Sequence, residues 1–327
     1  MNRFEWAEAK TISEAIGSLS NSAIVKAGGI DVIDRLKEGL ESPKQIVNIR
    51  NIKGLDYARE DKAAGVLRLG PLVTLDQLDK NPIVRQKFTA LADAAGKAAT
   101  PQIRNVATLG GNLLQRPRCW YFRNELFNCR KKGGTRCFAQ DGENEYHAIF
   151  DNRTCAIVHP SATATALVAF GAKIELTGAK GKREILLEEF FVHPDQDVMR
   201  ENSIGPDELI TEVRVPLPKA DVKSAYIKQG EKESFDWPIA DVAVVLDCAG
   251  KNCAKASIVL GAAAPVPYRA KKAEAALQGK IINEATARNA AKVALEDATP
   301  LAENGYKIPV FETIIRRTIL KAVGGAA

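Results

Sequence analysis

Four of the six cysteines in this 327-residue chain lie close together, which restricts what the middle of the chain can form. Cys119, Cys129, Cys137 and Cys155 follow 118 residues that contain no cysteine. The stretch 116–137, RPRCWYFRNELFNCRKKGGTRC, also carries seven basic residues. We expect a loop whose thiols bind a metal, because this combination is not typical of a regular helix or strand.

The spacing of these cysteines narrows the kind of metal site. The intervals are nine, seven and seventeen residues, whereas zinc fingers and ribbons have close C-x2–4-C pairs. Four loop thiolates suit a [4Fe–4S] cluster and, less well, zinc, while unligated thiols remain a third interpretation. His147 and His159 flank Cys155 but are the weaker ligand candidates, because four cysteines already complete a cluster. Basic residues favour ionised thiolates, and those in the stretch are Arg116, Arg118, Arg123, Arg130, Lys131, Lys132 and Arg136.

Composition and charge argue against several classes of protein. Hydrophobic residues make up 46% of the chain and charged residues 26%, as in globular proteins with a core. The net charge of +6 is mild for this length, which argues against nucleic-acid binding. The sequence contains no run of about 18 apolar residues, so no membrane-spanning helix is predicted. The N-terminus lacks a signal-peptide pattern, so we expect a cytoplasmic location, or a periplasmic one reached as cargo on an exported partner.

Apolar periodicity predicts alternating strands and helices in the first part of the chain. A strand at 23–27 precedes a helix at 31–40, for which Asp31 is the expected N-cap. A later helix is expected to begin at Thr74, and another, with proline in its first turn, covers 82–98.

Two prolines at the end of the stretch 207–218 mark the main domain boundary. Antiparallel strands with a turn near 250–252 are expected beyond it, followed by three helices. The predicted domains are 1–55, 56–218 with a cysteine loop at 116–156, and 219–327.

Two glycine pairs lie where a strand or loop meets a helix. Gly28–Gly29 follows the strand at 23–27, and Gly110–Gly111 lies in IRNVATLGGNLLQ, residues 103–115. Glycine lets the backbone approach an anion closely, with helix N–H groups directed toward it. Neither pair forms the G-x-G-x-x-G pattern of a Rossmann nucleotide site. The two turns could instead hold the two ends of one extended, phosphate-containing cofactor.

The order of four motifs resembles that of the FAD-binding medium subunits of the molybdenum hydroxylase (xanthine dehydrogenase) family. The motifs are AGGIDV, LGPLVTL, RNVATLGGNL and ESFDWPIADVAVVL. The resemblance covers nearly the whole chain and implies an α+β protein. Its expected architecture is a two-subdomain FAD-binding (PCMH-type) fold, followed by a domain of antiparallel strands plus helices. The cysteines directly after GGNLLQ are similar to a subgroup with an extra [4Fe–4S] cluster, which includes aldehyde oxidoreductase FAD subunits and 4-hydroxybenzoyl-CoA reductase β subunits.

The resemblance also implies roles for individual residues. The first glycine loop would wrap the FAD pyrophosphate, and it comprises Lys26, Ala27, Gly28, Gly29, Ile30, Asp31 and Val32. The second would lie along the flavin and its ribityl chain, and it contributes Asn105, Thr108, Gly110, Gly111, Asn112 and Gln115. Lys228 matches a basic position near the flavin. Ile30 and Ala162 replace a threonine and an aspartate that are common in relatives, so one cofactor contact is expected to be lost at each.

The resemblance implies an electron-transfer subunit of a heterotrimer, itself possibly dimerised. A large partner would bind the molybdenum cofactor and oxidise the substrate, and a small partner would carry [2Fe–2S] centres. Electrons would pass between those centres, FAD and an external acceptor. No catalytic residue is expected in this chain, because no Ser-His-Asp set or carboxylate pair is evident. Two alternatives stay open: a stand-alone flavin oxidoreductase, and a zinc-stapled interaction subunit without FAD.

Overall fold

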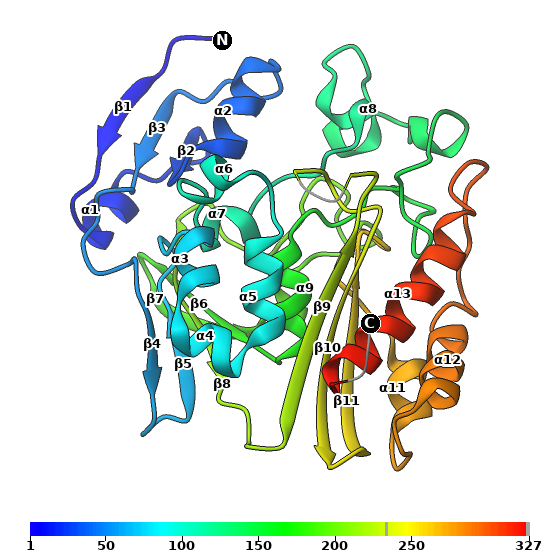
Figure 1. Ribbon diagram of the computed structural model, residues 1–327. Helices are drawn as coiled ribbons and strands as arrows, with labels where there is room; N and C mark the ends of the chain where they lie inside the picture. The colour runs from blue at the N-terminus through cyan, green and yellow to red at the C-terminus, as the bar shows by residue number, and fades with distance from the viewer. Residues whose placement is uncertain (233–234, 325–327) are drawn as a thin grey trace.

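The computed structural model describes residues 1–232 and 235–324, and its strands form three sheets. The first sheet is small and parallel, with the order β1-β3-β2 (Figure 1). It consists of β1 (Glu5–Glu8), β2 (Ala23–Lys26) and β3 (Gln45–Asn48), which are joined by α1 (Ile12–Gly17) and α2 (Ile30–Lys37).

The predicted cap of α2 is wrong. Gly29 is the N-cap, with a φ of 86° and no side-chain hydrogen bond, and Asp31 lies in the first turn of the helix. A left-handed φ favours glycine because it has no Cβ. The chain can therefore turn directly from β2 into the helix, and the Asp31 carboxylate remains available for other partners.

The second sheet is antiparallel and has the order β4-β5-β8-β6-β7. Side chains alternate along β5, where Leu67 and Leu69 are buried and Arg68 is half-buried on the opposite face. The buried face contributes to a core that it shares with helices. The sheet strands are β4 (Ala58–Asp61), β5 (Val66–Leu69), β6 (Lys173–Gly178), β7 (Gly181–Leu186) and β8 (Glu208–Pro216), and the helices that share this core include α3 (Leu75–Lys80), α4 (Pro82–Lys87), α5 (Thr89–Gly96) and α9 (Ala162–Ala169).

Two helix predictions for this region had different outcomes. Thr74 caps α3 as expected, in a capping box with Gln77. The single helix predicted over 82–98 is instead split into α4 and α5 at Phe88, whose φ of −130° and ψ of 50° are not helical. The Phe88 side chain is buried against Phe170, with ring centroids 5.2 Å apart. Tertiary packing therefore accompanies the break, which the apolar pattern does not reveal.

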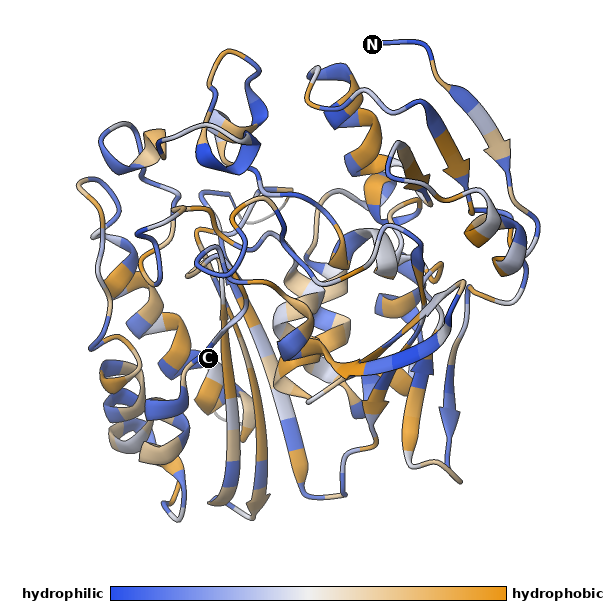
Figure 2. Ribbon diagram, turned by 180° about the vertical axis from the view of Figure 1, so that it is seen from behind, coloured by the Kyte–Doolittle hydropathy of each residue, from blue (hydrophilic) through white to orange (hydrophobic). Residues whose placement is uncertain are grey.

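The third sheet has the order β12-β11-β10-β9 and is covered on both faces. One face of the sheet, with Tyr226, Ala243 and Val259, packs into the core formed with α5 and α9. The opposite face, with Ala225 and Val242, packs into a second core. Figure 2 shows much of the two central strands, β10 and β11, in the hydrophobic colour. The elements are β9 (Val222–Gln229), β10 (Ala240–Ala249), β11 (Asn252–Gly261), β12 (Tyr268–Arg269), α11 (Lys271–Leu277), α12 (Glu284–Val293) and α13 (Lys307–Ala322).

The α+β fold class is confirmed, with the expected antiparallel sheet and helices in the C-terminal part. The predicted boundary at 218 lies just before β9, whose Tyr226 packs into the core of the preceding region. The domain limits themselves remain a prediction. None of the helices in the described ranges is long and apolar enough to cross a membrane.

The N-terminal sheet and the loops that carry the glycine pairs and the cysteines lie toward one end of the molecule (Figure 1). The N-terminal sheet and the cysteine segment, which contains α8 (Trp120–Arg123), lie at the same end in both views (Figures 1 and 2). The remaining short helices are α6 (Pro101–Arg104), α7 (Leu109–Leu113) and α10 (Leu187–Phe190), with 3-10 turns at Arg130–Lys132 and Phe138–Gln140.

Candidate functional site

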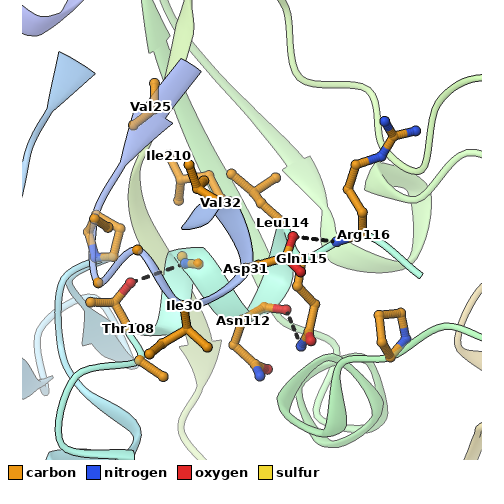
Figure 3. A pocket seen from close by; sticks show the side chains of 18 of the residues that line it. Val25, Ile30, Asp31, Val32, Thr108, Asn112, Leu114, Gln115, Arg116 and Ile210 are labelled. Carbon is orange, nitrogen blue, oxygen red and sulfur yellow. Dashed lines mark hydrogen bonds between the residues drawn. The ribbon is translucent and has the colours of Figure 1, made fainter. Parts of the chain in front are cut away.

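A cavity of ≈ 480 Å³ lies between the N-terminal unit and the second sheet, and both glycine turns line it. This volume is in the usual range for cofactor and ligand sites. Figure 3 shows Ile30, Asp31 and Val32 from the first turn facing Thr108, Asn112 and Gln115 from the second. The turns are about 80 residues apart in the sequence, and only the fold makes them one site.

Gly28 is the point where the two glycine turns meet. A Cβ built on Gly28 would lie 2.1 Å from the carbonyl oxygen of Val106 and 3.4 Å from the Cα of Ala107. Both are backbone atoms, so they cannot move aside as a flexible side chain can. Gly28 is thus required by close backbone approach, whereas its neighbour Gly29 is required by its φ of 86°.

The second glycine turn is held by side-chain hydrogen bonds. The Thr108 hydroxyl is the N-cap of α7 and accepts from the Gly111 N–H at 3.2 Å. Asn112 Oδ1 accepts from Ser161 Oγ at 2.7 Å and from Thr163 Oγ1 at 2.6 Å. These bonds anchor the turn to the first turn of α9, so its backbone presents a preformed wall to the cavity.

Most residues expected to contact the cofactor line this cavity, but Lys26 and Asn105 do not. Lys26 Nζ donates to Asn48 Oδ1 at 3.2 Å and lies 5.5 Å from the centre of the Trp6 ring. Asn105 is the C-cap of α6. The predicted residues that do line the cavity are Ala27, Gly28, Gly29, Ile30, Asp31, Val32, Thr108, Gly110, Gly111, Asn112, Gln115 and Lys228.

Lys228 reaches the cavity from β9. Its ammonium donates to the carbonyl of Lys97 at 2.9 Å and to that of Asp236, and burial is the first cause of its lowered pKa. Ala162 and Trp237 also line the wall. Residues 233 and 234, the first two of the ESFDWP motif, lie outside the described residues.

Asp31 joins the first glycine turn to the cysteine segment, a role that the sequence did not predict. Its carboxylate accepts from the Arg123 guanidinium at 2.7 Å, from that of Arg118 at 2.9 Å and from the Arg116 backbone N–H at 3.1 Å. Burial alone would raise the pKa of Asp31, but the arginines, including Arg35, outweigh it and lower the pKa. A half-buried, ionised carboxylate thus forms part of the cavity wall.

The basic residues of the cysteine segment are paired more than we expected. Glu201, which lines the large cavity, accepts from Arg116 and from Lys131, each at 3.0 Å. Arg123 pairs with Glu38 at 3.1 Å in addition to Asp31. Much of the positive charge therefore ties the segment to neighbouring elements, and only Arg130 and Lys131 of these residues line the cysteine cavity.

Cys119, Cys129, Cys137 and Cys155 line one small cavity, together with His147. The free volume between these side chains is ≈ 10 Å³. Across the described ranges, no group of three or more His, Cys, Asp or Glu side chains is arranged to hold a single metal ion. A [4Fe–4S] cluster has a different iron atom for each cysteine, and its ligands stand further apart.

The thiols differ in their readiness to ionise. A hydrogen bond with Cys155 lowers the pKa of Cys137 to about 6, and the same bond raises the pKa of Cys155. Burial raises the pKa of Cys119 to about 12. Metal binding displaces such protons, because the thiolate is the ligand. Four thiols that line one cavity are the kind of donor set that an iron–sulfur cluster takes.

Two buried histidines lie near this region. Burial lowers the pKa of His147 to about 4 and that of His159 to about 3, so both rings are neutral near pH 7. His147 Nε2 lies 3.2 Å from Cys119 Sγ. His159 Nδ1 accepts from the Ser161 N–H at 3.3 Å, and His159 is not part of the cysteine cavity wall.

Replacing Arg123 with glutamine is expected to remove the ion pairs with Asp31 and Glu38 that connect the cysteine segment to the first glycine turn and α2. Arg123 is only 9% exposed and also donates to the carbonyls of Pro117 and Arg116. Hydrogen bonds to charged groups contribute about 1.5–3 kcal/mol when buried, so we expect a destabilisation of about 2 kcal/mol in urea unfolding. Arg153→Gln, at an exposed position, is the matched control and should change stability little. Equal stability of the two variants would contradict the bridging role.

Two family models match consecutive parts of the chain. Residues 2–218 match the FAD binding domain in molybdopterin dehydrogenase. Residues 225–322 match the CO dehydrogenase flavoprotein C-terminal domain.

Individual proteins are similar over the same length. The aldehyde oxidoreductase FAD-binding subunit PaoB of Escherichia coli (strain K12) is 31% identical, over 100% of this chain and 99% of its own. The nicotinate dehydrogenase FAD-subunit of Eubacterium barkeri is 29% identical, over 85% of this chain and 81% of its own. Among solved structures, a carbon monoxide dehydrogenase from Hydrogenophaga pseudoflava superposes with a TM-score of 0.77 at 26% identity, covering 100% of this chain and 99% of that one.

Proposed function

We propose, since the chain belongs to the FAD-binding medium subunits of the molybdenum hydroxylase family, that it is the electron-transfer subunit of a heterotrimeric hydroxylase. FAD binding and membership of an oxidoreductase complex follow from the family. The proposal adds a [4Fe–4S] cluster, the route of the electrons and the three-subunit arrangement. The observation that carries it is the pair of neighbouring cavities, one lined by both glycine turns and one by four thiols.

The large cavity offers the features that FAD requires. The N–H groups in the first turn of α2 suit the pyrophosphate, and Gly28 and Gly29 let the backbone come close to it. The turn at Gly110–Gly111 would lie along the flavin and ribityl chain, with Lys228 as a cation at the far wall. Bound FAD supplies the redox chemistry, taking up electrons from one partner and releasing them to another. Ile30 and Ala162 line the wall without a side-chain hydrogen-bonding group, which is consistent with the two lost contacts.

The four cysteines are the proposed ligands of the [4Fe–4S] cluster. A cluster at this place would supply a further one-electron station beside the flavin. Cys119 is the residue next to Arg118, which lines the large cavity and pairs with Asp31. The walls of the two cavities therefore share one chain segment, which supports the proposal that they work together.

The partners would be a large subunit with the molybdenum cofactor and a small one with [2Fe–2S] centres. The relatives named above include aldehyde, nicotinate and carbon monoxide enzymes, so specificity would belong to the large subunit. An aldehyde is the substrate class we favour, because the aldehyde oxidoreductase subunit has the highest identity of the three proteins named above, 31% against 29% and 26%. The cytoplasmic location and the direction of electron flow remain predictions.

The isolated chain should not oxidise an organic substrate. In contrast, co-expression with neighbouring molybdenum and [2Fe–2S] subunits should give a stable complex in which an aldehyde bleaches the flavin absorbance. The reason is that substrate bonds would break at the molybdenum cofactor, which this chain is not expected to bind. A pull-down from native extract, followed by metal and cofactor analysis, identifies the partners.

Two outcomes would contradict the proposal. Turnover of an organic substrate by the chain alone, without molybdenum, would establish the stand-alone oxidoreductase. Stoichiometric zinc without flavin would establish the interaction subunit. A visible spectrum separates these cases, because a cluster adds broad absorbance near ~400 nm to the flavin peaks.

A further inference from the structure

The imidazole of His147 lies against one of the proposed cluster ligands. Its Nε2 is 3.2 Å from Cys119 Sγ, and the residue is 3% exposed. The proposed function assigns this histidine no role.

The main chain of His147 is held by groups outside the four cysteines. The backbone N–H of His147 donates to the carbonyl of Asn144 at 3.0 Å. The His147 carbonyl accepts from Lys307 Nζ at 2.9 Å and from Asn304 Nδ2 at 3.1 Å. The imidazole and the ring of Trp120, the residue next to Cys119, meet in a T-shaped contact with centroids 5.1 Å apart. These contacts, one of them from Lys307 in α13, fix the main chain of His147 so that the ring lies with Nε2 beside the Cys119 sulfur.

The other ring nitrogen helps to place the proton. Nδ1 is buried and has no hydrogen-bond partner among the described residues. The sulfur is thus the ring's polar contact within the structure. A neutral imidazole carries one N–H, and a thiolate can only accept. A proton on Nε2 therefore gives an N–H···S bond, whereas a proton on Nδ1 would direct a lone pair at a thiolate.

We propose that His147 is a positioning residue that donates its Nε2–H to the Cys119 sulfur and so raises the reduction potential of the cluster. This inference rests on the proposed [4Fe–4S] cluster. Hydrogen bonds to cluster sulfurs stabilise the more negative, reduced state, and they are among the factors that set its potential. The histidine is not itself a ligand, because four thiols complete the coordination.

The test is an EPR-monitored redox titration of anaerobically purified protein together with its partners. His147→Phe keeps a flat ring against Trp120 but removes the donor, and His147→Leu is a second variant without a donor. His147→Gln retains an N–H at a similar reach. His159→Phe is the matched control, since His159 is also buried but does not line the cysteine cavity.

We expect the donor-less variants to retain full iron and sulfide while the cluster potential becomes more negative. A tenfold change in the equilibrium of a one-electron couple is about 59 mV, and a shift of that order is expected. His147→Gln and His159→Phe should stay near the parent value. An unchanged potential in His147→Phe or His147→Leu overturns the inference alone, as does loss of iron from all three His147 variants. A parent protein without iron overturns the cluster proposal, and this inference with it.

Discussion

Replacing Gly28 with alanine is expected to lower the affinity for FAD by about ten- to a hundredfold. The new Cβ would lie 2.1 Å from the Val106 carbonyl oxygen, so the two glycine turns would have to separate. Overpacking of this kind costs about 1–3 kcal/mol, and each 1.4 kcal/mol is about a factor of ten in affinity. The loss falls on FAD because both displaced turns line its cavity. Flavin content after purification and flavin fluorescence titration measure it.

Two other glycines provide the controls for this experiment. Gly17→Ala places a Cβ where nothing lies within 4 Å, so it should leave flavin binding unchanged. In Gly111→Ala the nearest atom is the Thr108 hydroxyl at 3.1 Å, and a side chain can adjust, so a smaller loss is expected. Undiminished FAD affinity in a folded Gly28→Ala protein would show that the two turns are not the cofactor site.

Single replacement of any of the four cavity cysteines with serine is expected to remove or destabilise the cluster. Anaerobically purified parent protein should contain about four iron and four sulfide per chain, the content of one [4Fe–4S] cluster. Serine is a poor substitute because the soft thiolate is the preferred iron ligand. Iron and sulfide analysis with the visible spectrum gives the result for Cys119, Cys129, Cys137 and Cys155.

Cys248→Ser is the control for the cluster experiment. Cys248 is buried and lies opposite Cys253 across β10 and β11, remote from the four thiols in the fold. It should retain the full cluster. Stoichiometric zinc without sulfide in the parent protein would reject the iron–sulfur assignment, and a variant of Cys119 with undiminished iron would remove that residue from the ligand set.

The Arg123, Gly28 and cysteine experiments bear on one question, which is whether the two cavities form one functional unit. The Asp31 carboxylate connects them by accepting from Arg118 and Arg123. If this connection matters, loss of the cluster should also weaken FAD retention. The flavin content of the cysteine variants therefore provides a second readout from the same samples.

The sequence by itself determined the local features of this protein. The start of α3 at Thr74 depends on residues a few positions apart, and the sequence predicts it. The glycine pairs and the four cysteines were also evident, since residue type alone restricts what such positions can do. Motif order then indicated the family.

Only the tertiary structure decided which distant residues meet. It brought Gly28 against Val106, moved the cap of α2 from Asp31 to Gly29, and gave Asp31 three partners in the cysteine segment. It also placed Lys26 and Asn105 outside the cavity and His147 at a thiol. The physical reason is that such contacts join residues far apart in the chain, and their energy depends on distance and burial in three dimensions. No periodicity or spacing in the sequence carries that information.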